Sequence, residues 1–128
     1  ISATDWAEGG WNADQSVELA RTLKDHGVDL VDVSTGGLID GVTIPVKPGY
    51  QVPFADRIRA KAGVPTTAVG LITKPRQAQK IVAHGQADAV EIGRAALRDP
   101  YWPLRAAAKL GVERARIPSP PQYLRGAW

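Results

Sequence analysis

Neither cysteine nor methionine occurs among the 128 residues of the chain. The absence of cysteine excludes disulfides and thiolate metal sites, and we expect no metal centre. No apolar run approaches the ~20 residues of a membrane-spanning helix, and no segment has the pattern of a signal peptide. We therefore expect a cytoplasmic protein without a membrane partner.

Acidic residues are scarce toward one end of the chain, although the total charge is modest. Sixteen Lys and Arg residues oppose thirteen Asp and Glu residues, and residues 91–128 hold seven basic residues against three acidic ones. This basic end has no aromatic residues interleaved on a strand face and no recognisable nucleic-acid-binding module. A phosphate ligand or an acidic partner surface explains it with fewer assumptions, so we expect no nucleic-acid partner.

Strand-like and helix-like segments alternate along the chain, whose length suits one domain. Short, largely apolar runs that end at Ser2, Ser34, Gly70 and Gly93 read as four strands. Amphipathic segments predict helices over residues 13–26, 53–62, 74–84 and 101–110, with a short helical turn at residues 95–98. Each strand is therefore followed by a helix, which is the pattern of repeated βα units.

Suitable capping residues stand at the predicted helix ends. Asn12 and Thr73 are good N-caps, and Gly27 is a good C-terminal stop. His26 and His84 each precede a glycine that ends a helix, where an imidazole suits the last carbonyl groups. We interpret both histidines as capping residues rather than as catalytic groups.

Two architectures fit repeated βα units with a parallel sheet. One is a small doubly wound sheet that stands alone, and the other is half of a (β/α)8 barrel. The half-barrel fits better, because the phosphate site of such barrels typically lies in the loops after the last two strands, beside a short extra helix. Asp32 and Glu91 lie within strands, where we expect them in polar layers of the barrel interior rather than in catalysis.

An anion site is predicted around residues 88–97. Gly93 ends a strand and lets backbone approach a ligand closely, and Arg94 follows at the start of a helical turn. Free amide groups and a guanidinium together suit a phosphate. The alternative is an ordinary strand-to-helix turn in which Arg94 is a solvated side chain.

Five segments form an ordered set of motifs along the chain: Ile1-Ser2-Ala3, Asp32-Val33-Ser34-Thr35-Gly36, Pro48-Gly49-Tyr50-Gln51-Val52-Pro53-Phe54-Ala55, Val69-Gly70-Leu71-Ile72-Thr73 and Val90-Glu91-Ile92-Gly93-Arg94-Ala95-Ala96-Leu97-Arg98-Asp99-Pro100. With these motifs the chain resembles the old yellow enzyme family of FMN-dependent ene-reductases over essentially its whole length. The terminal Gln122-Tyr123-Leu124-Arg125-Gly126-Ala127-Trp128 is similar to the thermophilic-like branch.

This resemblance implies the C-terminal half of an FMN-binding (β/α)8 TIM barrel, with about four βα units over residues 1–116 and an extended tail over residues 117–128. In the family, the residues that match Gly70, Gly93 and Arg94 bind the FMN phosphate. The barrel's N-terminal half, the expected partner, supplies the carbonyl-binding pair, which is two histidines or a histidine and an asparagine, and the tyrosine proton donor. An arginine that contacts the flavin normally precedes the position of Ile1. We therefore expect a cofactor half-site here and no catalytic residue.

The implied activity is that of an oxidoreductase. NADPH or NADH reduces FMN, and the flavin then passes hydride to a small activated alkene. We expect the isolated chain to be inactive. The alternative is a non-catalytic half-barrel that acts only as a phosphate-binding or structural module.

The proline-rich segment at residues 117–121 is predicted to be extended and to carry the tail away from the barrel. In the resembling branch, the arginine that matches Arg125 reaches the neighbouring subunit's active site, which implies a substrate-binding role and a homo-oligomer formed through the tail. Ala127 departs from the pattern of some members, which puts the docking of Trp128 in doubt but not that of Arg125.

Overall fold

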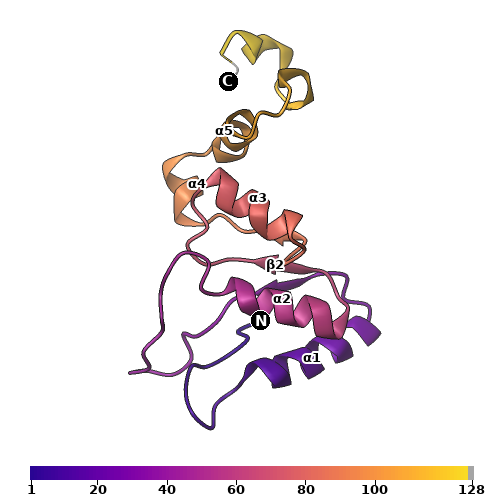
Figure 1. The fold of residues 1–128 in the computed structure, drawn as a ribbon, viewed down its shortest axis with the longest axis vertical. Helices are drawn as coiled ribbons and strands as arrows, with labels where there is room; N and C mark the ends of the chain where they lie inside the picture. Colours follow the sequence, from indigo (N-terminus) through magenta and orange to yellow (C-terminus); the bar gives the residue numbers. More distant parts are fainter. Residues whose placement is uncertain (127–128) are drawn as a thin grey trace.

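Three short parallel strands form the sheet in the computed structural model, which describes residues 1–126 (Figure 1). The strands are β1 (Val31–Val33), β2 (Thr66–Ala68) and β3 (Ala89–Val90), in that order across the sheet. Ser2 forms an isolated parallel bridge with Ser34, beyond the end of β1. The prediction of a mixed α/β chain with a parallel sheet is therefore confirmed.

Strand β3 ends three residues before Gly93, where the sequence predicts its end. Only Thr67 with Ala89, and Ala68 with Val90, meet in register. The amides of Asp88 and Glu91 nevertheless donate to the carbonyls of Thr66 and Ala68, at 2.9 Å each. Parallel hydrogen bonding thus extends to Glu91, and the chain leaves the sheet at Ile92.

Five α-helices and two 3₁₀ helices account for most of the remaining described chain. They are α1 (Ala13–Asp25), α2 (Val52–Ala62), α3 (Pro75–Ala83), α4 (Arg94–Arg98), α5 (Trp102–Lys109), η1 (Arg114–Arg116) and η2 (Pro121–Gly126). None of these helices is long and apolar enough to cross a membrane.

Helix α1 begins at the predicted residue and ends one residue before its predicted end. The Asn12 side chain accepts hydrogen bonds from the amides of Asp14 and Gln15, and the Gln15 side chain accepts the Asn12 amide in return. This reciprocal cap contributes about 1 kcal/mol. At the other end His26 is the C-cap, and its Nδ1 lies 2.8 Å from the Thr22 carbonyl oxygen. The capping role predicted for His26 is confirmed.

The predicted Thr73 cap of α3 is wrong. Lys74 occupies the N-cap position without a side-chain cap, and the Thr73 amide instead donates to Oε1 of Gln77 at 3.2 Å. Pro75 at the first helical position has no N–H to satisfy, which reduces the need for a capping side chain. His84 is the C-cap, as predicted.

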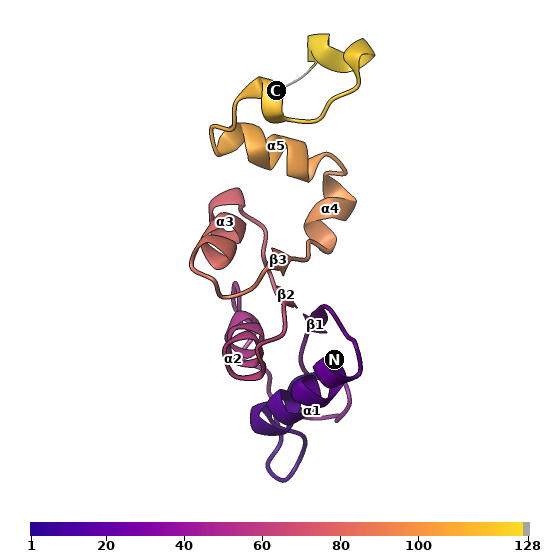
Figure 2. The same ribbon diagram turned by 90° about the vertical axis from the view of Figure 1, so that its right-hand side faces the viewer.

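Helices α2 and α3 cover one face of the sheet, and α1 packs against α2 (Figures 1 and 2). Val31 and Val33 of β1 point into the resulting core, together with Ile58 of α2, whereas Asp32 between them is exposed. The opposite face of the sheet is not covered by a helix in the described chain (Figure 2). Helices on one side of parallel strands are consistent with part of a (β/α)8 barrel.

The last third of the chain extends away from the sheet through α4, α5 and the tail (Figure 2). Trp102 anchors α5, because its side chain is buried and its Nε1 donates to the Thr73 carbonyl at 3.3 Å. Residues 118–120 form neither helix nor strand, as predicted, but η2 begins at Pro121, so the prediction that the whole segment is extended is wrong. The fixed φ of proline is compatible with the first position of a 3₁₀ turn. Ala127 and Trp128 lie outside the described residues.

Candidate functional site

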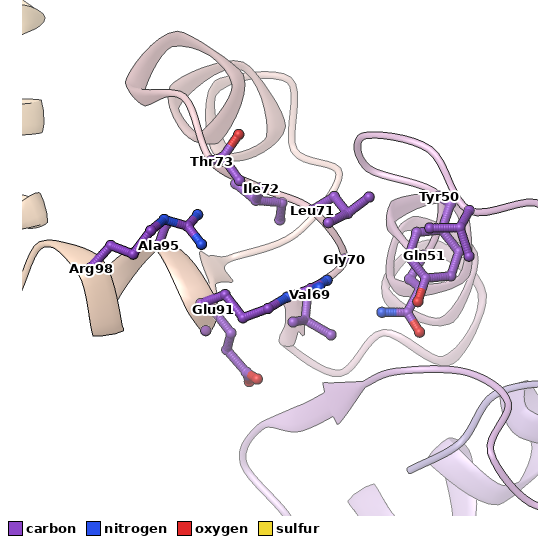
Figure 3. A pocket seen from close by; sticks show the side chains of 13 residues that line it. Tyr50, Gln51, Val69, Gly70, Leu71, Ile72, Thr73, Glu91, Ala95 and Arg98 are labelled. Carbon is purple, nitrogen blue, oxygen red and sulfur yellow. The ribbon is translucent and has the colours of Figure 1, made fainter.

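A cavity of about 330 Å³ lies at the carboxyl ends of β2 and β3 (Figure 3). It brings together Gly70, Gly93 and Arg94, the three residues predicted to form the anion site. Tyr50 and Gln51 stand on one side of the cavity, and Ala95 and Arg98 stand on the other (Figure 3). The remaining lining residues are Val46, Val69, Leu71, Ile72, Thr73 and Glu91.

Gly70 is required by the backbone geometry at the end of β2. Its φ is +114°, a conformation that other residues rarely adopt, and a Cβ there would lie 3.0 Å from Nε2 of Gln51 and 3.1 Å from Cε1 of Tyr50. Its carbonyl accepts the Gly49 amide at 2.8 Å. The glycine therefore allows the β2 terminus and the start of α2 to pack closely.

The loop after Gly70 is held by Gln77 of α3. Leu71 also has a positive φ, +52°, so two successive residues turn the chain sharply. Nε2 of Gln77 donates to the Leu71 carbonyl at 3.2 Å, while its Oε1 accepts the Thr73 amide. One side chain thus fixes both ends of the turn that forms a wall of the cavity.

Gly93 and the start of α4 form the opposite wall. A Cβ on Gly93 would meet no atom of the chain within 4 Å, so the space beside this residue is open. The Gly93 carbonyl accepts the amides of Ala96 and Leu97, and the amides of Arg94 and Ala95 have no acceptor among residues 1–126. Helix α4 has only five residues, so these individual amides matter more than any helix dipole.

Arg98 is a lining residue that the sequence interpretation did not identify. It follows Arg94 by four residues on α4, a spacing that places two side chains on the same side of a helix. Neither arginine forms an ion pair in the described part of the chain, so both guanidinium groups are available for an anion. The four-residue spacing of the two arginines is the sequence signal from which Arg98 could have been identified.

Among residues 1–126, only Glu91 brings a carboxylate to the cavity lining, and this carboxylate points away from Arg98 and Thr73 (Figure 3). Its Oε1 accepts the Thr67 hydroxyl at 2.5 Å, and Oδ1 of Asp32 lies 3.3 Å from the same hydroxyl. A hydroxyl has a single proton, so it donates to one carboxylate at a time. The carboxylates gather on the uncovered face of the sheet, and Thr67 keeps Glu91 away from the cavity's basic side.

Arg125 is not brought to this cavity within the chain. It lies on η2, where it is exposed, at the far end of the structure from the sheet (Figure 1). The described residues also contain no cluster of three His, Cys, Asp or Glu side chains that could hold a metal ion.

An ion pair joins α2 to β3 at the opposite end of the strands. Nε and Nη2 of Arg59 donate to the two carboxylate oxygens of Asp88 at 2.8 and 3.1 Å, and the Thr66 amide donates to the same carboxylate at 3.0 Å. The hydrogen bond from Arg59, followed by that from Thr66, lowers the pKa of Asp88. The pair raises the pKa of Arg59 in turn. This contact is structural, since it lies away from the cavity.

Comparison with known proteins identifies a family that this chain resembles in sequence. Residues 1–113 match the sequence model of a family described as "NADH:flavin oxidoreductase / NADH oxidase family". The chain is 50% identical over 126 residues to an NADPH dehydrogenase of Geobacillus thermodenitrificans, and 49% identical over 128 residues to one of Listeria monocytogenes. These alignments cover 98% and 100% of the chain but 36% of each relative, so the chain spans about a third of their length.

Proposed function

Because the chain belongs to the NADH:flavin oxidoreductase / NADH oxidase family, we propose that it supplies the FMN phosphate site of an ene-reductase of the old yellow enzyme type. The observation that carries this proposal is the meeting of Gly70, Gly93 and Arg94 around one cavity. The NADPH dehydrogenases that resemble the chain support a redox role.

The residues around the cavity fit a phosphate monoester. The amides of Arg94 and Ala95, which have no acceptor among residues 1–126, can each donate a hydrogen bond to a phosphate oxygen. The Arg94 and Arg98 guanidinium groups can neutralise its charge, one of them in a bidentate contact. The open space at Gly93 gives the phosphate access to the backbone.

When bound, FMN would accept hydride from NADPH or NADH and deliver it to an activated alkene. The part of this chain is to hold the phosphate end of the cofactor and so orient the rest of it. Because the Gln77 side chain, the Gly49 amide and close packing at Gly70 fix one wall, the site is pre-organised for that task.

We further propose that residues 1–116 form about four βα units of a (β/α)8 barrel, with residues 117–128 as a separate tail. The uncovered sheet face, which bears Asp32 and Thr67, then becomes the barrel interior. The other barrel half would supply the carbonyl-binding and proton-donating residues. In isolation the chain should therefore be inactive.

The tail is proposed to join two copies of the assembled enzyme. Tyr123 and Leu124 on η2 are 70% and 46% exposed, and large side chains of this kind anchor interfaces. Arg125 lies beside them and is exposed. We propose that it reaches the substrate in the neighbouring subunit.

Replacing Arg94 by alanine tests the phosphate site. In a protein that contains the whole barrel, Arg94→Ala should weaken FMN binding about ten- to a hundredfold, because a charge-assisted hydrogen bond contributes roughly 1.5–3 kcal/mol. Riboflavin, which has no phosphate, should lose much less affinity. Both affinities can be measured by fluorescence titration.

Arg116→Ala is the matched control, since Arg116 is an exposed arginine of η1 outside the cavity. It should leave both affinities unchanged. If Arg94→Ala lost affinity equally for FMN and for riboflavin, Arg94 would not bind the phosphate. Flavin binding without turnover in the whole barrel would favour a non-catalytic phosphate-binding module.

A further inference from the structure

A second cavity, of about 500 Å³, lies between the start of α2 and the length of α3. We call it the α2–α3 groove; its lining residues are Pro48, Gly49, Val52, Pro53, Arg76, Gln77, Lys80, Ile81, His84 and Gln86. It shares no lining residue with the cavity that contains Gly70 and Gly93. The proposed function does not account for it.

One wall of the groove is basic. Arg76, Lys80 and His84 follow one another at four-residue intervals along α3 and its C-cap, and all three side chains are exposed. Arg76 and Lys80 form no ion pair within residues 1–126. Residues 74–87 include no Asp or Glu, and no described carboxylate lines the groove. The positive charge of α3 is therefore uncompensated inside the described chain.

The basic surface continues from α3 to α5. Arg76 and Lys80 also line a smaller cavity, of about 260 Å³, together with Lys109 of α5. Residues 100–112 likewise contain no Asp or Glu. Three cationic side chains thus line these two cavities, and no carboxylate of residues 1–126 lines either one.

The other wall of the groove is apolar and rigid. Pro48 and Pro53 are both exposed, and their rings restrict the backbone before and within the first turn of α2. Val52 of α2 is buried and lines the same wall, while Ile81 is a buried lining residue of α3. A small inorganic anion would use the cations alone, whereas a peptide can contact both walls.

The spacing of the cations matches that of side chains on an extended peptide. Residues four apart on a helix are separated by about 6 Å along its axis. Alternate side chains of an extended chain lie on one side, about 6.6 Å apart, and the intervening side chains point the opposite way. We propose that the α2–α3 groove docks an extended acidic segment of a partner protein, whose alternate carboxylates face Arg76 and Lys80 while the intervening apolar side chains face Pro48 and Pro53.

The test uses a synthetic peptide, acetyl-Glu-Val-Glu-Val-Glu-amide, with a fluorescent label. Fluorescence anisotropy with the 128-residue chain should show saturable binding that weakens as salt is added, since exposed charges are screened. The double variant Arg76→Glu/Lys80→Glu should lose at least about tenfold in affinity, as two attractions become repulsions of similar size. The neutral peptide acetyl-Gln-Val-Gln-Val-Gln-amide should bind far more weakly.

Lys61→Glu/Arg116→Glu is the matched control, because it reverses two exposed cations that do not line the groove. It should retain peptide binding. Arg76→Gln/Lys80→Gln, which avoids new negative charge, should show a smaller loss in the same direction, and circular dichroism should show every variant folded. Equal losses in the control variant, or displacement of the peptide by an equal concentration of inorganic tripolyphosphate, would overturn the proposal.

Discussion

Gly70 and Gly93 line the same cavity but have different physical reasons to be glycine. Gly70 has a left-handed φ and no room for a Cβ, whereas Gly93 has a φ of −81° and open space beside it. The first is needed by the fold itself. At Gly93 the space beside the backbone is open, as the proposed phosphate site requires.

Alanine substitutions should separate these two roles. Gly70→Ala should lower the free energy of unfolding by about 1–3 kcal/mol, the usual cost of a strained backbone conformation, and denaturant titration can measure this. Gly93→Ala should change unfolding little. It should nevertheless weaken FMN binding in the whole barrel, because the new methyl group enters the phosphate's space. Equal destabilisation by both substitutions would contradict this distinction.

The sequence predicted Gly70, Gly93 and Arg94 through a recognisable pattern, and the structure places all three around one cavity. Gln77 could not be predicted in the same way. Its side chain binds Leu71 and Thr73, six and four residues earlier in the chain, and that contact depends on the unusual backbone conformation of the turn at Leu71. A single sequence shows the periodicity of a helix, but it does not show which backbone groups one side chain of that helix will bind.

At the scale of elements, Arg59 ties α2 to the start of β3 through Asp88. Strand β3 is at the edge of the described sheet and pairs over only two residues. The carboxylate also accepts the Thr66 amide at the start of β2. One acidic side chain therefore joins a helix and two strands.

The lowered pKa of Asp88 predicts how stability depends on pH. A carboxyl group whose pKa is lower in the folded state stabilises the fold above its unfolded pKa, near 4, and loses that effect as the pH falls through the folded value. The midpoint temperature of thermal unfolding should therefore decrease as the pH is lowered below about 4. Asp88→Asn should unfold at a lower temperature at pH 7 and lose part of this acid dependence.

Asp25→Asn is the control for that measurement, because Asp25 is exposed and forms no ion pair among the described residues. It should behave like the unmodified chain at each pH. If Asp88→Asn retained the full acid dependence, other carboxylates would be responsible for it.

Element ends were predicted well at α1 and less well at α3. The Asn12 cap of α1 and the Gly27 stop after it are both found, and Gly27 has a left-handed φ of +87°. At α3 the N-cap position falls on Lys74, the residue after Thr73. A suitable capping residue in the sequence therefore does not fix which of two neighbouring residues becomes the cap.

At the scale of the whole molecule, the described chain is elongated and leaves one face of its sheet without helices (Figure 2). The uncovered face carries Asp32 and Thr67, while η2 with Arg125 lies at the opposite end of the molecule from α1 (Figure 1). If the proposed barrel and dimer form, these are two distinct surfaces. The uncovered sheet face would meet the other barrel half, and η2 would meet a second subunit.

Arg125→Ala tests the role of the tail in the assembled enzyme. It should raise KM for an activated alkene more than it changes FMN binding, because the proposed contact is with substrate and not with cofactor. Arg116→Ala, a similarly exposed arginine, should leave KM unchanged. Deletion of residues 122–128 should also weaken subunit association in sedimentation. Wild-type kinetics and subunit association in both variants would show that the tail has no role in substrate binding or dimer formation.

The anchoring of α5 by Trp102 gives the molecule a built-in optical probe. This indole is buried and donates its N–H to the carbonyl of Thr73, a residue that lines the proposed phosphate cavity. Its emission should therefore change when the loop is displaced or stiffened by a bound anion. A variant in which Trp6, Trp11 and Trp128 are replaced by phenylalanine would report the entry of colourless inorganic phosphate, which flavin absorbance cannot detect.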